Sequence, residues 1–115
     1  SLDANSKVTA SEASAKIFTY TDSHTLLLEN AGALVEMNKF TACNLTVPPN
    51  SSVAFPVGTE IEIKQLGAGQ VTIVAGSGVT LRNADTALKI EKQYCSASLK
   101  KRATDEWYVD GRTVA

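Results

Sequence analysis

The fold class of this 115-residue chain is indicated most clearly by one stretch in the middle of the sequence. The stretch runs Glu60-Ile61-Glu62-Ile63-Lys64-Gln65, then Leu66-Gly67-Ala68-Gly69, then Gln70-Val71-Thr72-Ile73-Val74-Ala75. In its first part isoleucines alternate with charged residues, which is the pattern of a strand with one buried and one solvated face. The glycine-bearing middle part is typical of a turn that needs positive φ. We therefore predict that 60–65 and 70–75 form an antiparallel hairpin.

Similar short runs rich in Val, Ile and Thr lie on both sides of this stretch, separated by Gly, Pro and Asn. Upstream they occupy 17–20, 25–28, 34–37 and 44–47, and downstream they occupy 79–82, 93–100 and 107–109. The last two segments, with Asp105 and Glu106 between them, predict a second hairpin. The two successive prolines at 48–49 predict a loop, because neither can donate a backbone hydrogen bond. We expect an all-β fold, an antiparallel β-sandwich or small barrel of about eight or nine short strands.

The length fits one domain with an ordinary hydrophobic core. Residues 1–16 are rich in Ser, Ala and Thr and have no strong period, so we expect an extended N-terminal arm there and a single β domain at 17–115. We expect the arm to attach the protein to a neighbour or to another subunit, with the apolar side chains of Leu2, Val8 and Ile17 as contacts. The small residue Ser1 fits a complete gene product whose initiator Met was removed, and a domain cut from a longer fibre fits as well.

Composition excludes several function classes. Lys and Arg number 11 against 12 Asp and Glu, giving a formal net charge of -1, so the basic excess of a nucleic-acid binder is missing. No apolar run approaches the roughly 20 residues of a membrane span, and the first residues lack the pattern of a secretory signal. We therefore expect no nucleic-acid and no membrane partner. Two cysteines, Cys43 and Cys95, are favoured as buried thiols over a disulfide, because each has apolar neighbours of the same parity.

Motifs that carry catalytic chemistry are missing from the sequence. His24 is the only histidine and lies in a polar segment that we expect to be a solvated loop. There is no Gly-x-Ser-x-Gly elbow, no zinc spacing and no calcium loop. Glu60 and Glu62 are expected on a solvated strand face, and the basic run at 100–102 is expected in a solvated turn. We predict a non-enzymatic protein with no catalytic residue, no metal and no cofactor.

Several long segments carry a resemblance to a known family. They are 45–59, 67–73 and 76–81, followed by Gln93-Tyr94 and by Thr104-Asp105-Glu106-Trp107. Together they resemble a β domain found repeatedly in structural proteins of tailed bacteriophages, over roughly residues 19–111. Two departures are Cys95, where an aliphatic residue is usual, and the more charged segment 88–92, which we interpret as a partner-facing loop. The resemblance implies a component of a tail fibre, a minor structural protein or a protein that decorates the head.

The resemblance leads to two functional hypotheses. The first is a capsid-decorating (cement) protein, which fits a small chain with an arm. It would be a homotrimer on the surface of the virion that binds the major capsid protein, or a neighbouring virion protein, and stabilises the head. The second is a tail-fibre or receptor-binding domain that recognises a host-surface glycan. Trp107 and Tyr108 would be its aromatic platform, although strand alternation allows only one of the two rings to face outward.

Overall fold

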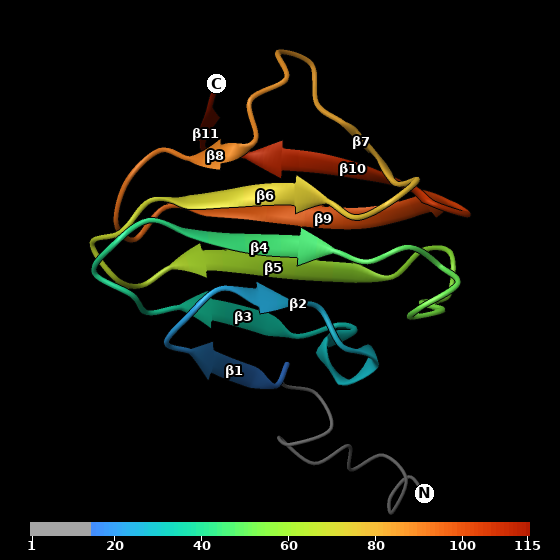
Figure 1. The fold of residues 1–115 in the computed structure, drawn as a ribbon, viewed down its shortest axis with the longest axis horizontal. Helices are drawn as coiled ribbons and strands as arrows, with labels where there is room; N and C mark the ends of the chain where they lie inside the picture. Colours follow the sequence, from blue (N-terminus) through green and yellow to red (C-terminus); the bar gives the residue numbers. More distant parts are fainter. Residues whose placement is uncertain (1–14) are drawn as a thin grey trace, which may run out of the picture.

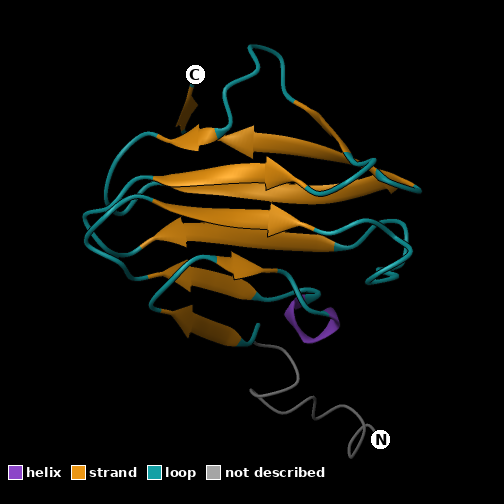
Figure 2. Cartoon of the chain, viewed as in Figure 1, coloured by secondary structure: helices purple, strands orange, loops and turns teal. Residues whose placement is uncertain are grey.

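The protein is nearly all-β, as the sequence predicts. The computed structural model describes residues 15–115, and in these residues one short 3-10 turn, η1 (Leu28–Asn30), is the only helical element (Figure 2). Eleven strands make up the rest of the regular structure in this part of the chain. They are β1 (Ile17–Tyr20), β2 (His24–Thr25), β3 (Leu34–Met37), β4 (Cys43–Val47), β5 (Glu60–Gln65), β6 (Val71–Ala75), β7 (Thr80–Arg82), β8 (Lys89–Ile90), β9 (Ser96–Ala103), β10 (Glu106–Gly111) and β11 (Thr113–Val114).

The strands form two mixed sheets that share one core (Figure 1). The first sheet has six strands in the order β1-β3-β5-β9-β10-β7, and the second has five in the order β11-β8-β6-β4-β2. Alternate residues of both sheets are buried, as the period of two requires. Leu45 and Ile73 from the second sheet and Ile63 and Leu99 from the first belong to the same buried cluster.

The first six strands pair in parallel, which the sequence analysis did not anticipate. Successive strands alternate between the sheets, so that β1, β3 and β5 lie parallel in the first sheet and β2, β4 and β6 lie parallel in the second. The chain therefore winds through three successive strand pairs, each with one strand in either sheet. We call these pairs rungs, and they are β1–β2, β3–β4 and β5–β6. The predicted antiparallel hairpin of 60–65 and 70–75 is wrong, because β5 and β6 belong to different sheets.

The turn between β5 and β6 explains this error. Ile63 and Ile73 enter the same core whether the chain reverses within one sheet or crosses to the other, so the alternation is identical in both cases. The buried side chain of Gln65 fastens the crossing, since its Oε1 accepts from the amide of Val71 at 3.2 Å and its Nε2 donates to the carbonyl of Gly67 at 3.3 Å.

Gly67 and Gly69 are needed for close approach rather than for positive φ. Neither has a positive φ. A Cβ atom at Gly67 would overlap the backbone of Lys39, and one at Gly69 would overlap the carbonyl of Thr41. The turn after β5 thus lies directly on the turn after β3, so successive rungs are in backbone contact at this end of the molecule.

The C-terminal half contains the second predicted hairpin. Strands β9 and β10 pair antiparallel, which confirms that prediction, and the turn is formed by Thr104 and Asp105, the latter with a φ of 57°. The predicted strand at 93–100 begins only at Ser96. The charged segment at 88–92 includes strand β8, whose Ile90 is fully buried, so it is not wholly the loop that was expected.

The basic run at 100–102 lies in β9 rather than in the solvated turn that was expected. Lys101 points into the core and is 2% exposed. Its Nζ donates to Asn50 Oδ1 at 2.6 Å and to the carbonyl of Phe55 at 2.7 Å. The loop after the two prolines is fastened further where the amide of Asn50 donates to Asp105 Oδ1 and where the Phe55 ring packs edge-on against Trp107.

Both cysteines are free and buried, as predicted. Burial raises the pKa of the Cys43 thiol, an effect that the nearby positive charge of Lys39 partly opposes. In the described part of the chain, no helix is long and apolar enough to cross a membrane.

Candidate functional site

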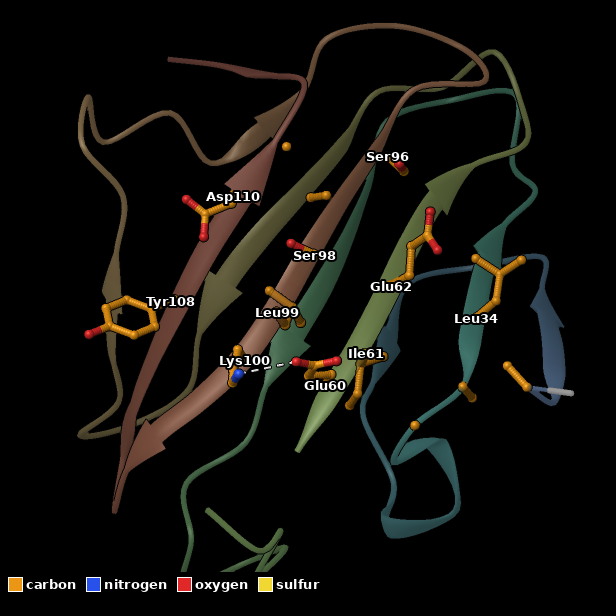
Figure 3. Close-up of a pocket in the computed structure, with 15 residues that line it drawn as sticks. Leu34, Glu60, Ile61, Glu62, Ser96, Ser98, Leu99, Lys100, Tyr108 and Asp110 are labelled. Atoms are coloured by element: carbon orange, nitrogen blue, oxygen red, sulfur yellow. Dashed lines mark ion pairs between the residues drawn. The ribbon is translucent and has the colours of Figure 1, made fainter. Parts of the chain in front are cut away.

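A groove with a volume of about 540 Å³ crosses the outer face of the first sheet (Figure 3). Strands β3, β5, β9 and β10 supply the side chains that line it, together with Ala15 and Gly32 near one end. The residues that give the groove its chemical character are Leu34, Glu62, Ser98, Lys100, Tyr108 and Asp110. All of them occupy outward-facing positions of their strands, opposite the buried residues of the core.

Strand register places these side chains in two rows across the sheet. In the first row Leu34 faces Glu62, Glu62 faces Ser98, and Ser98 faces Asp110. In the second row Glu60 faces Lys100, and Lys100 faces Tyr108. Directly opposed residues on neighbouring strands have Cβ atoms about 4.5–5.5 Å apart, so the members of each row are neighbours. The short side chain of Ser98 makes a low point between two carboxylates.

The two rows differ in how their charges are balanced. Lys100 Nζ lies 3.2 Å from Glu60 Oε2, so the second row carries an ion pair (Figure 3). Glu62 and Asp110 form no ion pair with any residue in the range 15–115. The first row therefore presents two uncompensated carboxylates around a hydroxyl group, and this part of the groove is anionic.

Of the two aromatic side chains predicted as a platform, only Tyr108 reaches the groove. Trp107 is 1% exposed and belongs to the core, so it is not available to a ligand. Tyr108 is 42% exposed, and its hydroxyl accepts a hydrogen bond from Arg102 Nε at 3.0 Å. The alternation expected for adjacent residues in a strand is confirmed here.

A charged network holds Arg102 in position beside Tyr108. Glu106 accepts from Arg82 at 2.9 Å and from Arg102 at 3.1 Å. The hydrogen bond from Arg82 holds the pKa of the Glu106 carboxyl below its usual range, and the charge of Arg102 acts in the same direction. The hydrogen bond to Tyr108, followed by the charge of Glu106, raises the pKa of Arg102. The orientation of the tyrosine ring is thus coupled to a network of charges at the edge of the groove.

The predicted contact residues of the arm are only partly described. Leu2 and Val8 lie outside the described residues, as does most of the segment 1–16. Ile17 begins β1 and is 62% exposed. Among residues 15–115, β1 pairs with β3 alone, so its other edge carries no main-chain partner from this part of the chain. The four residues 17–20 include no proline and no charge, the usual means by which proteins protect such an edge.

His24 does not lie in the solvated loop that was expected. It belongs to β2 and is half-buried, with its ring stacked on that of Tyr20 at a centroid distance of 3.6 Å. Asn30 Nδ2 donates to the Tyr20 hydroxyl, so Asn30 Oδ1 is the acceptor and His24 Nε2 donates to it at 3.0 Å. The side chains of Tyr20, His24 and Asn30 are therefore hydrogen-bonded to one another. No group of three His, Cys, Asp or Glu side chains among the described residues is arranged to hold a metal.

The row of Glu62, Ser98 and Asp110 was missed at the sequence level. Glu62 was correctly predicted to be solvated, but the sequence does not say which residues lie beside it. Its neighbours come from β9 and β10, more than thirty residues later in the chain. The available signal was the pair of serines at 96 and 98, which are unusually small for outward positions of a strand.

A comparison with protein-family models, with curated proteins and with solved structures found no match.

Proposed function

We propose that the chain is a non-enzymatic structural module of a bacteriophage virion that joins its neighbours through the end of the molecule at which β1 lies. The observation that carries the proposal is the outer edge of β1, with its exposed Ile17 and its unprotected run of β-forming residues. Such an edge is a template for pairing with another chain. The N-terminal arm leads directly into this strand, so attachment by the arm and pairing by the edge would act at one place.

Within that class we propose a capsid-decorating protein that binds the major capsid protein, or a neighbouring virion protein, and forms a homotrimer on the virion surface. The resemblance of 45–59, 67–73 and 76–81 to phage structural β domains supports this assignment. The two facing sheets fit a β-sandwich better than a closed barrel, because β1 and β7 end the first sheet as edges and β2 and β11 end the second. A flat-sided body with open edges suits a protein that sits among copies of itself.

Removal of residues 1–16 tests the role of the arm. We expect the truncated chain to keep its circular dichroism spectrum and a cooperative melting transition while it no longer binds capsids stripped of the protein. A single change, Ile17→Asp, is expected to weaken binding at least tenfold, since burial of an isoleucine side chain is worth about 1.5–3 kcal/mol.

Val57→Asp is the matched control, because Val57 is 64% exposed but lies outside β1. Undiminished capsid binding by the truncated chain would refute attachment through the arm. Copy number separates the head from the tail: hundreds of copies per virion are expected for a decorating protein, whereas a few would place the chain in a fibre or neck and contradict the assignment.

A second candidate function is recognition of a host-surface glycan by a tail-fibre or receptor-binding domain. One observation favours it, namely that Tyr108 lines a groove together with the polar side chains of Glu62, Ser98 and Asp110. An aromatic ring beside hydrogen-bonding groups is the arrangement that carbohydrate recognition requires. A glycan array on which the protein binds nothing would eliminate this candidate and leave the structural role untouched.

A further inference from the structure

We propose that the groove on the outer face of the first sheet binds a neutral, hydroxyl-rich oligosaccharide, held between the carboxylates of Glu62 and Asp110 and against the ring of Tyr108. The inference rests on the second candidate function and deepens it. It names a site, the row of Glu62, Ser98 and Asp110, together with the charge class of the ligand.

The groove has the dimensions of a ligand site. Its volume of about 540 Å³ lies within the range of about 300–1,000 Å³ that is usual for small-molecule sites. Strands β5 and β10 are separated by β9, so their backbones lie about 10 Å apart, at about 4.8 Å per strand. Only the short side chain of Ser98 stands between Glu62 and Asp110. A ring-shaped ligand can therefore lie on the floor at Ser98 with a carboxylate on either side.

The charge of the groove excludes anionic ligands. Among the described residues 15–115, Lys100 is the one cation that lines the groove, and it is already paired with Glu60. A phosphate, sulfate or acidic sugar would face Glu62 and Asp110 without compensation, and like charges at close range repel. The site therefore selects against nucleic acids and acidic polysaccharides.

Apolar ligands and extended peptide strands fit no better. An apolar ligand would meet Leu34 and the ring of Tyr108, but Ile61 and Leu99 are buried beneath the groove. It would also remove water from the two charged carboxylates without offering them a hydrogen bond, which is costly. An extended peptide cannot add a strand along the groove, because β9 pairs with β5 on one side and with β10 on the other.

Sugar hydroxyls match what the groove offers. Each carboxylate can accept several hydrogen bonds, and bonds that involve an ionised group are stronger than neutral ones. The Ser98 hydroxyl can both donate and accept. The exposed Tyr108 ring offers an apolar surface to the C–H face of a sugar ring, and its hydroxyl is held by Arg102. The ring is therefore oriented before the ligand arrives, which reduces the entropy lost on binding.

Nuclear magnetic resonance titration of the full-length ¹⁵N-labelled protein tests the site. The probes are two neutral hexasaccharides, maltohexaose and hexa-N-acetylchitohexaose, and one anionic hexasaccharide from heparin. We expect at least one neutral probe to shift the amide resonances of 60–62, 96–100 and 108–111 in a saturable manner. The heparin probe is expected to leave these resonances unchanged.

Variants localise the binding. Glu62→Ala and Asp110→Ala are each expected to weaken the neutral probe about tenfold, the effect of one charge-assisted hydrogen bond. Ser98→Leu, which raises the floor, is expected to abolish binding. Glu29→Ala, an exposed carboxylate on η1, is the matched control and should bind as the unmodified protein does.

Three outcomes would overturn the inference, and they differ in what they leave standing. Preferred binding of the heparin probe would refute the charge argument. Shifts confined to residues outside the groove would refute the site while leaving glycan recognition intact. No binding by either neutral probe, together with an empty glycan array, would refute both the site and the second candidate function.

Discussion

At the scale of single residues, the buried ammonium group of Lys101 fixes the position of a loop against strand β9. Its two acceptors, on Asn50 and Phe55, both belong to the loop that follows the two prolines. A truncated side chain would leave buried oxygen atoms without a donor and would open a cavity. We expect Lys101→Ala to lower the free energy of unfolding by about 3 kcal/mol, measured by urea denaturation.

Lys100 provides the comparison for this variant. It is the preceding residue of the same strand but is exposed, and its ion pair with Glu60 lies at the surface. Lys100→Ala should therefore cost less than about 1 kcal/mol. Equal losses in the two variants would contradict a structural role for the buried ammonium group.

Glu106 makes stability depend on pH in the acid range. The hydrogen bond from Arg82 and the charge of Arg102 lower its pKa in the folded protein, so the folded state binds this proton more weakly than the unfolded state does. The contribution of the ionised Glu106 to the free energy of unfolding is complete above the unfolded pKa of about 4.3. It is lost as the pH falls through the pKa of the folded protein. Glu106→Gln should therefore flatten the dependence of unfolding free energy on pH below about pH 5. An unchanged slope would contradict the network.

Residue-level prediction from sequence succeeded where alternation alone decides the outcome. The inward Trp107, the outward Tyr108 and the two buried cysteines all follow from parity along a strand. It failed at His24, whose partners Tyr20 and Asn30 lie within six residues but follow no periodic pattern. It also failed at Lys101, which is buried because a distant segment supplies its partners. One of these partners is Asn50, some fifty residues earlier. No local pattern contains such information.

At the scale of elements, the turn after β5 can lie against the turn after β3 because glycine occupies positions 67 and 69. We expect Gly69→Ala to lower the free energy of unfolding by about 1–3 kcal/mol, because the added methyl group would overlap the carbonyl of Thr41. Ala68→Ser is the control, since Ala68 is exposed in the same turn. Thermal unfolding of both variants measures the difference, and a tolerated alanine at 69 would show that the rungs are less tightly stacked than described.

Element positions were largely predictable, whereas their partners were not. Most of the predicted segments contain a strand, and the β9–β10 hairpin follows from two adjacent alternating runs around a turn. The parallel winding of the first three rungs has no such local signature. Strand β3 pairs with β5, about 28 residues away, and each rung sends its second strand to the other sheet. The row of Glu62, Ser98 and Asp110 also needs the antiparallel pairing of β5 with β9, and no local pattern predicts that pairing.

At the scale of the whole molecule, the proposed trimer makes a prediction about mass. Sedimentation velocity at micromolar concentration should give a single species of about three times 12.2 kDa. If the edge of β1 forms the contact, Ile17→Asp should shift the distribution toward the monomer, because a charge would then be buried at the interface. A monomer in the unmodified protein would contradict the trimer.

The order of strands in the first sheet also bears on how the chain is made. The three rungs are synthesised before the β9–β10 hairpin, and each new rung can stack on the one before it. The free side of β5, however, waits for β9, whose pairing partners lie some 38 residues further along. Until the β9–β10 hairpin emerges, one edge of β5 has no partner strand in the first sheet. Chains stopped before residue 96 should consequently accumulate in the insoluble fraction, because they lack the β9–β10 hairpin that completes the sheet.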